Sequence, residues 1–285
     1  MKVAFQGVHG AYSEVATKKF FGRQCHTAPR ETFKGVFDAV ERGTVDRGVI
    51  PIENSLAGSI HENYDLLISH HVQIVGEAHL RIEHVLMCHP SSSFRQLKHV
   101  RSHPQALAQC SRFFARNKRI TPEAYFDTAG AAQSLSHDRS FETGAIASAY
   151  AAKLYGLKIL KRNLENQSNN MTRFLVIARN PWRPTPGIPT KCSIAFRPLK
   201  NQVGILFRVL GVFALRDIDL LKIESRPDPD ASFEYMFYLD LAGTPKDGKV
   251  ARALDHLQEM VRNFRILGAY PAATGTLHEG PGKRN

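Results

Sequence analysis

Five short stretches of the sequence place small polar residues where a strand is expected to end or a helix to begin. In chain order they are "GVHGAYSE" (7–14), "PIENSLAGS" (51–59), "SHPQAL" (102–107), "DTAGAAQSL" (127–135) and "NNMTRF" (169–174). Hydroxyls, amides and the free backbone N–H groups of helix N-termini are donors that suit oxyanions. Each stretch alone is explained as well by a helix cap or a turn. Five of them together favour an anion-binding cleft.

The last stretch stands at the mouth of an apolar segment, Phe174–Ile177, which is typical of a buried strand. The hydroxyl of Thr172 and the guanidinium of Arg173 precede that segment directly. Adjacent residues on a strand point to opposite faces, so we expect only one of the two to touch a ligand directly. The local sequence alone leaves both a capped turn and a ligand site open.

The sequence does not indicate a cofactor or a metal site. Gly7 and Gly10 form only a G-x-x-G pattern, without the acidic residue about 20 positions later that a dinucleotide site requires. The three histidines at positions 79, 84 and 89 recur every five residues, which does not place them on one helix face. The four cysteines are far apart, which favours a reducing, cytoplasmic compartment.

Residues 1–178 alternate between strand-like and helix-like segments, which favours an α/β region with helices on both faces of its sheets. The helix–turn–strand rhythm of residues 33–55 recurs in residues 131–156, so we expect two related lobes. Residues 84–90 and 172–178 are candidate crossover strands late in their lobes. Ser13 is the expected N-cap of the first helix, and Gly22 its end.

A proline-rich stretch at 179–190 indicates a stiff linker to a second region. Residues 191–271 show the element order βαββαβ, which is that of a ferredoxin-like sandwich. The remainder, 272–285, is expected to be a flexible tail. The 285 residues carry a formal charge of +12, but the cations are scattered and no reader motif appears, so nucleic acid is not an expected partner. The sequence has no secretory signal and no apolar run of about 18 residues, so we expect no membrane association.

Together the five stretches resemble the prephenate dehydratase family, whose motifs are a glycine-containing start, Glu-Asn-Ser, Ser-His-Pro-Gln-Ala-Leu, Asp-Thr-Ala-x-Ala-Ala and Asn-x-Thr-Arg-Phe. All five occur here in order. The resemblance covers residues 1–271 and continues into a regulatory ACT domain, where "NQVGILF" (201–207) and "KIESRP" (222–227) are similar to the two effector motifs. The family's Pro-Gly-Ala-Leu is Val-Gly-Ile-Leu at 203–206, a departure at the effector site.

The resemblance implies a catalytic region with two lobes, like type-2 periplasmic binding proteins. It also implies a monofunctional enzyme, since no chorismate mutase domain precedes Met1. The family removes carbon dioxide and water from prephenate to give phenylpyruvate, in L-phenylalanine biosynthesis. Aromatisation drives this reaction, so a site of neutral donors without a cofactor is sufficient. The implied catalytic residues are Thr172, Arg173 and Phe174. Thr172 would donate to the leaving oxygen, and Arg173 would be a carboxylate clamp or a lobe-fixing ion pair.

The implied substrate-binding residues are polar groups of the five stretches: Ser13, Asn54, Ser55, Ser102, His103, Gln105 and Thr128. L-Phenylalanine is the implied allosteric effector, with the residues Asn201, Gly204, Ile205, Leu206, Glu224, Ser225 and Arg226. ACT-like domains pair through exposed sheet edges, so we expect a homodimer or homotetramer. Two alternatives stay open at this point: an arogenate dehydratase, and a non-catalytic amino-acid sensor that binds its ligand between lobes.

Overall fold

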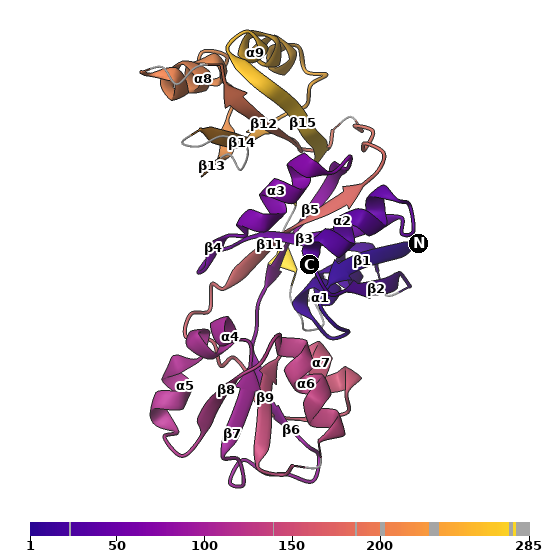
Figure 1. Cartoon of the computed structure of the whole chain (residues 1–285), viewed down its shortest axis with the longest axis vertical. Helices are drawn as coiled ribbons and strands as arrows, with labels where there is room; N and C mark the ends of the chain where they lie inside the picture. The colour runs from indigo at the N-terminus through magenta and orange to yellow at the C-terminus, as the bar shows by residue number, and fades with distance from the viewer. Residues whose placement is uncertain are drawn as a thin grey trace. The chain divides into compact units, whose positions relative to one another are not determined.

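The computed structural model describes residues 1–22, 24–138, 140–185, 187–199, 203–227, 234–273 and 276–277. The chain divides into two compact units. Unit 1 comprises residues 1–60, 78–174 and 275–285, and unit 2 comprises residues 61–77 and 175–274. Both units combine helices with sheets (Figure 1), as the alternation of the sequence predicts.

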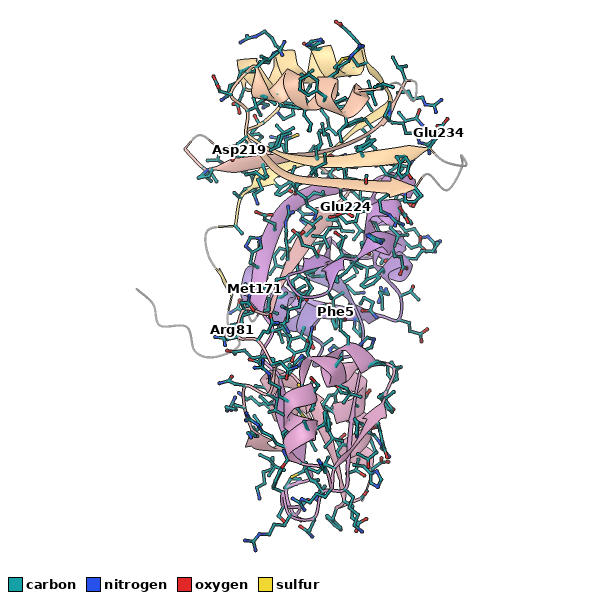
Figure 2. All side chains as sticks on the ribbon, turned by 90° about the vertical axis from the view of Figure 1, so that its left-hand side faces the viewer. Phe5, Arg81, Met171, Asp219, Glu224 and Glu234 are labelled. Carbon is teal, nitrogen blue, oxygen red and sulfur yellow. The ribbon has the colours of Figure 1, made fainter. Side chains whose placement is uncertain are left out.

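Lobe 1 is the part of unit 1 formed by residues 1–60, 78–81 and 171–174. Its sheet has the order β16-β5-β11-β3-β1-β2, and β1 is parallel to both β2 and β3. The strands are β1 (Lys2–Gln6), β2 (His26–Arg30), β3 (Arg47–Asn54), β5 (Gln73–Arg81), β11 (Met171–Ala178) and β16 (Thr276–Leu277), and the short β4 (Gly58–Ser59) pairs with β3. β5 and β11 each continue along the chain into unit 2. Phe5, labelled in Figure 2, is fully buried within this lobe.

Two helices of lobe 1 follow from local signals. In α2 (Phe33–Glu41), the side chain of Thr32 accepts a hydrogen bond from the N–H of Gly35, and Val36, Phe37 and Val40 form the buried stripe of an amphipathic helix. α1 (Tyr12–Phe21) ends at Gly22 as predicted, but its N-cap is Ala11, so the prediction of a Ser13 cap is wrong. The carboxylate of Glu14 accepts the N–H of Gly10 at 2.7 Å, which supports a helix start two residues earlier than a cap at Ser13 would give.

Lobe 2 is formed by residues 85–161 of unit 1. Its sheet has the order β10-β6-β9-β7-β8. The strands are β6 (Val85–Cys88), β7 (His99–Ser102), β8 (Thr121–Ala124), β9 (Thr143–Ala147) and β10 (Lys158–Lys161). The helices are α4 (Pro104–Gln109), α5 (Ser111–Arg116), α6 (Thr128–His137) and α7 (Ala149–Leu154). Small residues such as Ala131, Ala145 and Ala151 are fully buried here, because helices and sheet pack closely.

The two lobes repeat one strand order, which confirms the prediction of two related α/β lobes. In each lobe, the first strand (β1 or β7) lies between the second (β2 or β8) and the third (β3 or β9). Beyond the third strand lies the strand that adjoins a connection (β11 or β6), and beyond that the fourth strand (β5 or β10). The connections are residues 82–84 and 162–170, and Arg81 and Met171 mark their lobe 1 ends in Figure 2. Residues 85–88 therefore belong to lobe 2, not to the end of lobe 1 as expected.

Unit 2 contains the predicted βαββαβ order. Its elements are β12 (Thr190–Pro198), α8 (Ile205–Ala214), β13 (Leu220–Pro227), β14 (Tyr235–Ala242), α9 (Gly248–Gln258) and β15 (Val261–Pro271). The four strands pair antiparallel in the order β13-β14-β12-β15. One sheet face packs against α8 and α9, with Phe196, Phe213 and Leu254 in its core. The fold is therefore the expected ferredoxin-like sandwich.

The second face of that sheet carries α3 (His61–Ser69), which also belongs to unit 2. The rings of Tyr64 and Tyr238 stack edge-on with centroids 4.9 Å apart, and the Tyr238 hydroxyl donates to the Tyr64 carbonyl at 3.1 Å. Arg265 donates to the carbonyl of Ile68, near the end of α3, and to that of His70, the first residue after the helix. α3 therefore shields part of the sheet face that lies opposite α8 and α9.

Between the regions, residues 179–185 and 187–189 form neither helix nor strand. Most of the predicted tail, 272–285, lies outside the described residues. Of its described part, Thr276–Leu277 pair in parallel with His79–Leu80 of β5. In the described parts of the chain, no helix combines the length and the apolar character that a membrane crossing requires.

Candidate active site

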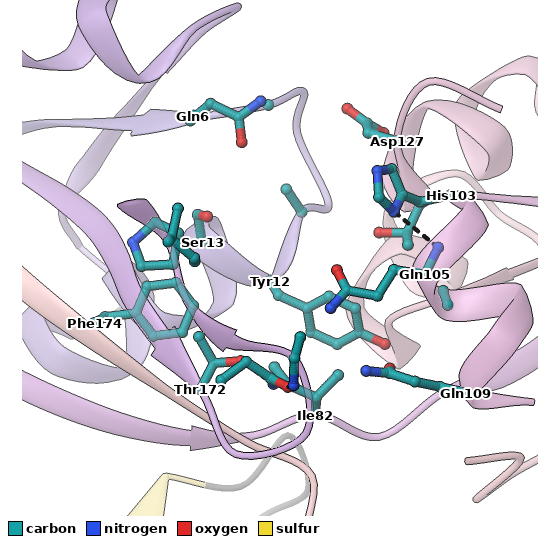
Figure 3. A pocket seen from close by; sticks show the side chains of 18 of the residues that line it. Gln6, Tyr12, Ser13, Ile82, His103, Gln105, Gln109, Asp127, Thr172 and Phe174 are labelled. Carbon is teal, nitrogen blue, oxygen red and sulfur yellow. Dashed lines mark hydrogen bonds between the residues drawn. The ribbon is translucent and has the colours of Figure 1, made fainter. Parts of the chain in front are cut away.

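A pocket of about 500 Å³ lies within unit 1 and draws its lining from both lobes (Figure 3). Lobe 1 contributes Gln6, Gly7, Ala11, Tyr12, Ser13, Pro51, Asn54, Ala57, Gly58, Ser59, Ile60, Thr172 and Phe174. Lobe 2 contributes His103, Gln105, Ala106, Gln109, Asp127 and Thr128, and the first connection contributes Ile82 and His84. All five stretches that the sequence singled out thus meet at one pocket.

Thr172 is oriented by an amide that is itself fixed. The side-chain nitrogen of Asn54 donates to Thr172 Oγ1 at 2.9 Å and to Asn170 Oδ1 at 2.8 Å. Its carbonyl oxygen accepts the backbone N–H groups of Leu56 and Ala57, both at 3.0 Å. Because the Thr172 oxygen accepts from Asn54, the hydrogen of its hydroxyl is the part that a ligand in the pocket can use. The Thr172 hydroxyl therefore remains able to donate to a ligand.

Arg173 points away from the pocket, as the alternation of a strand requires. Thr172 and Phe174 belong to the lining, whereas Arg173 does not. Its guanidinium lies 3.3 Å from the carboxylate of Glu53, and its side chain is 9% exposed. Of the two roles open for Arg173, this geometry corresponds to the ion pair, which joins β11 to β3 within lobe 1.

Two predicted binding residues lie outside the lining. The Ser55 hydroxyl donates to the carbonyl of Asn169 and accepts the N–H of Met171, at 2.8 and 2.9 Å. Ser102 is fully buried, and its hydroxyl donates to the carbonyl of Ile146 at 2.6 Å. Both serines hold backbone next to the pocket. Ser13, Asn54, His103, Gln105 and Thr128 do belong to the lining.

Lobe 2 presents helix starts to the pocket. Asp127 caps α6 by accepting the N–H of Gly130, and burial raises the pKa of its carboxyl although the backbone N–H of Gly130 works in the opposite direction. The side chain of His103 caps α4 by accepting the N–H of Gln105 at 3.2 Å, which leaves its other ring nitrogen as a donor. The helices α1 and α6 both begin at lining residues, so the positive ends of two ten-residue helices face the pocket.

The electrostatic character of the pocket follows from this lining. Among the described residues that line it, none is a lysine or an arginine. An anionic ligand would therefore be held by hydroxyls, amides, imidazole N–H groups and helix N-termini, and not by a full positive charge.

Among the lining residues that the sequence analysis did not predict, Tyr12, His84 and Gln109 are joined by polar contacts. The Tyr12 hydroxyl lies 2.8 Å from His84 Nδ1, and His84 Nε2 lies 2.9 Å from Gln109 Oε1. Gln109 was within reach, since it follows Gln105 by four residues and shares its helix face. Tyr12 stands inside the first of the five stretches. No local signal identifies His84, whose burial depends on segments distant in sequence; that burial lowers its pKa.

The predicted effector residues lie in unit 2, except Asn201, which lies outside the described residues. Gly204 caps α8 with φ of 77°, a left-handed conformation that favours glycine, and Ile205 and Leu206 open the helix. On β13, the Glu224 carboxylate lies 3.4 Å from His61 and 3.5 Å from Lys222.

The other two predicted effector residues on β13 point to opposite faces of the sheet. Arg226 pairs with Asp65 of α3 at 2.9 Å, on the side of Glu224, which is labelled in Figure 2. Ser225 therefore points to the face that carries α8. The carboxylate of Glu224, one of the predicted effector residues, is thus already ion-paired on the α3 side of the sheet.

Comparisons with known proteins show which family the chain belongs to. A family model described as prephenate dehydratase matches residues 3–181, and one described as ACT domain matches residues 199–257. A relative from Arabidopsis thaliana, named "Arogenate dehydratase/prephenate dehydratase 1, chloroplastic", is 46% identical over 285 residues, which cover 95% of this chain and 72% of the relative.

Solved structures agree over nearly the full length. One, titled "GqqA- a novel type of quorum quenching acylases", is 36% identical with a TM-score of 0.89, covering 96% of this chain and 99% of that one. The prephenate dehydratase of Arthrobacter aurescens, in complex with L-Phe, is 26% identical with a TM-score of 0.88, covering 95% and 90%. The chain therefore belongs to the prephenate dehydratase family and carries an ACT domain.

Proposed function

We propose that this protein catalyses the decarboxylating dehydration of prephenate to phenylpyruvate, a carbon–oxygen lyase reaction of L-phenylalanine biosynthesis. Its family membership supports this reaction. The observation that carries it is the Thr172 hydroxyl, which lines a pocket of neutral donors and whose oxygen accepts a hydrogen bond from Asn54. A binding site alone would not require a donor fixed in this way.

The reaction balances with one proton taken up. The bond from the ring to its carboxylate breaks and releases carbon dioxide, and the electron pair enters the ring as the opposite carbon–oxygen bond breaks. The departing hydroxyl takes the proton and leaves as water. A hydrogen bond from Thr172 to that oxygen stabilises the negative charge that develops on it. Aromatisation of the ring makes a stronger acid or a cofactor unnecessary.

The rest of the pocket binds and orients the dianion. The helix starts of α1 and α6, with Ser13 and Thr128, offer N–H and O–H donors to the carboxylates. Gln105 and His103 add donors from lobe 2. Neutral donors suit this substrate, because a carboxylate clamped by a full charge is harder to convert to neutral carbon dioxide.

Arogenate is a second candidate substrate, since the Arabidopsis relative is named for both activities. Arogenate carries an ammonium where prephenate carries a ketone. Asp127 is the one carboxylate among the described lining residues, and it is the group that can receive this ammonium. Asp127→Asn should therefore lower kcat/KM for arogenate more than for prephenate. Equal losses for the two substrates would remove Asp127 from this role.

The decisive experiment is a turnover assay of the purified full chain with each substrate. Prephenate should give phenylpyruvate, followed by its absorbance, and arogenate should give phenylalanine. An N-acyl substrate belongs in the same assay, because a 36% identical structure is titled as an acylase. A folded protein that converts neither prephenate nor arogenate would overturn the proposal. Binding without turnover would favour the sensor alternative.

We infer further that L-phenylalanine inhibits the enzyme through its ACT domain. The Arthrobacter aurescens relative was solved with L-Phe, which supports this effector. Within unit 2, β13 holds α3 through the pairs Arg226–Asp65 and Glu224–His61. His61 follows Ile60 directly in the chain, and Ile60 lines the pocket. A shift of β13 on effector binding would therefore reach the pocket through α3.

Asp65→Asn tests this route, because it weakens the ion pair with Arg226 while the side chain keeps its size. Calorimetry should show phenylalanine binding within about threefold of wild type, whereas kinetics should show weaker inhibition. Lys34→Gln is the matched control, since it breaks an exposed ion pair with Asp38 on α2. Full inhibition of Asp65→Asn would exclude α3 as the route.

A homodimer or homotetramer is proposed on the basis of the sheet edges of unit 2. β13 is an edge strand with Leu221 and Ile223 exposed. α8, the helix that precedes β13 in the chain, exposes Leu206 and Phe207. Light scattering of the full chain measures the state. The cytoplasmic compartment stays a prediction from the cysteine content, while the Arabidopsis relative is named as chloroplastic.

A further inference from the structure

We propose that His84, neutral and with its proton on Nε2, is a positioning residue that sets the direction of Gln109 and, through two asparagines, of the Thr172 hydroxyl. The kinetic part of this inference rests on the proposed function. Its structural part does not, because the protonation of the ring can be measured without turnover.

A continuous chain of hydrogen bonds carries the inference. His84 Nε2 lies 2.9 Å from Gln109 Oε1, and the side-chain nitrogen of Asn170 donates to the same oxygen at 3.0 Å. Asn170 Oδ1 accepts from Asn54 at 2.8 Å, and Asn54 donates to Thr172 Oγ1 at 2.9 Å. The chain thus runs from His84 to the proposed catalytic hydroxyl.

The amide oxygen of Gln109 sets the direction of the bond from His84. Gln109 Oε1 can only accept, so the His84 Nε2 that faces it must carry a hydrogen. In a neutral ring Nδ1 is then an acceptor, and the Tyr12 hydroxyl, which lies 2.8 Å from Nδ1 and 3.0 Å from the Glu83 carbonyl oxygen, shares its hydrogen between these two acceptors. With its oxygen committed to His84 and Asn170, Gln109 has its amide N–H groups left for the pocket (Figure 3).

The ring is held at the place where the chain passes twice between the lobes. The backbone N–H of His84 donates to Glu165 at 2.9 Å, and the N–H of Leu164 donates to the His84 carbonyl at 3.0 Å. The N–H of Ile82 donates to the carbonyl of Asn170 at 2.8 Å. These bonds join the two connections at His84, and the ring of His84 then contacts Tyr12 of lobe 1 and Gln109 of lobe 2.

The surroundings of the ring favour its neutral form. His84 is 2% exposed, and this burial lowers its pKa, so the uncharged imidazole is the form present at neutral pH. Glu165 is the nearby charge that opposes this. One of its oxygens is engaged by the His84 backbone N–H, and the other lies 3.9 Å from Arg81.

Two substitutions separate a hydrogen-bond role from a packing role. His84→Leu fills a similar volume with an apolar side chain but removes the donor to Gln109. His84→Gln places an amide N–H at the position of Nε2. We expect His84→Leu to lower kcat by roughly tenfold to a hundredfold, since a misplaced donor loses transition-state stabilisation. His84→Gln should recover most of that loss, and both variants should melt within a few degrees of each other.

The outcomes are distinct. If His84→Leu keeps kcat and KM within about twofold of wild type, His84 does not position the site. Equal losses in the two variants at equal melting temperature would assign His84 to packing alone. The wild-type chain must turn over prephenate in the same assay, and its failure to do so counts against the proposed function and not against the hydrogen-bond chain.

A measurement that does not depend on activity is the 15N NMR spectrum of the histidine rings in the wild-type full chain. The His84 signals are identified by their absence from the spectrum of His84→Gln. We expect a protonated Nε2 and an unprotonated Nδ1 at neutral pH. A proton on Nδ1, or on both nitrogens, would overturn the assignment of the bond directions and with it the inference.

Discussion

Lobe 1 and lobe 2 build their sheets in the same strand order, yet the residues that follow equivalent strands do different work. The third strand of lobe 1, β3, ends in Asn54, which donates to Thr172. The third strand of lobe 2, β9, is followed by Ser148, which caps α7 and donates to the Gly10 carbonyl of lobe 1 at 2.7 Å. One position thus serves the proposed chemistry, and its counterpart holds the loop before α1.

The helices after the second strands differ in the same way. Thr32 caps α2 by accepting the N–H of Gly35 at 3.0 Å and does not belong to the pocket lining. Its counterpart Asp127 caps α6 and does line the pocket. A repeated topology therefore fixes where polar residues gather, while the neighbours of each position decide their use. In our proposal, lobe 1 carries the donor to the leaving oxygen, and lobe 2 contributes mainly to binding.

The strongest test of this division is Thr172→Ala in lobe 1. We expect kcat to fall by about a hundredfold or more, because the donor to the departing oxygen is lost. Thr172→Ser, which keeps the hydroxyl, should stay within about tenfold of wild type. Steady-state kinetics with both substrates measures the effect. Near wild-type kcat in the alanine variant would end the assignment of chemistry to lobe 1.

Glu14→Gln tests the loop before α1, whose Gly10 carbonyl accepts from Ser148 of lobe 2. The side chain of Glu14 is 1% exposed, and its oxygens accept from Gly10, Thr27 and Lys18. Burial alone would raise the pKa of Glu14, but these hydrogen bonds lower it overall. The variant should lose about 2 kcal/mol of unfolding free energy or more at neutral pH.

This loss should depend on pH with a definite sign. The charged carboxylate stabilises the fold above the pKa that Glu14 has in the unfolded chain, and this contribution disappears as the pH falls through its lowered folded pKa. Denaturant titrations at several pH values should therefore show the wild type approaching the variant in acid. A pH-independent difference would mean that Glu14 acts through its shape and not through its charge.

Gln105→Leu tests the binding role of lobe 2. We expect KM to rise roughly tenfold with kcat within about twofold, because in our proposal Gln105 binds substrate and transition state equally well. Gln133→Leu on α6, outside the pocket lining, is the matched control and should change neither constant. A fall in kcat as large as that of Thr172→Ala would show that the lobes share the chemistry.

The smallest expected effect is that of Asp127→Asn on stability. Burial raises the pKa of Asp127, so the folded chain holds its proton more readily than the unfolded chain, and stability from this group is lost as the pH rises through the raised pKa. Asparagine caps a helix as well as aspartate does. Above that pKa the variant should be more stable than wild type by up to about 1 kcal/mol, and below it the two should agree.

The sequence alone determined the features that depend on neighbours in the chain. Asp127 was expected at a helix start, and it caps α6 through Gly130, three residues on. The alternation of a strand separated Thr172 from Arg173, and only Thr172 belongs to the pocket lining. The order βαββαβ was readable from hydrophobic periodicity. These features are set by local backbone geometry, which short windows of sequence encode.

Tertiary structure decided every feature that joins distant residues. Glu53 pairs with Arg173 across 120 positions of sequence, and the Tyr12–His84 contact spans 72. α3 covers the regulatory sheet because Tyr64 and Asp65 find Tyr238 and Arg226 there. Ser13 is not the N-cap of α1, because the helix begins after Ala11 and the carboxylate of Glu14 accepts the N–H of Gly10. A hydrogen bond forms only between groups that the fold brings to within about 3 Å of each other. The residue types along the chain do not specify that distance for residues far apart in the sequence.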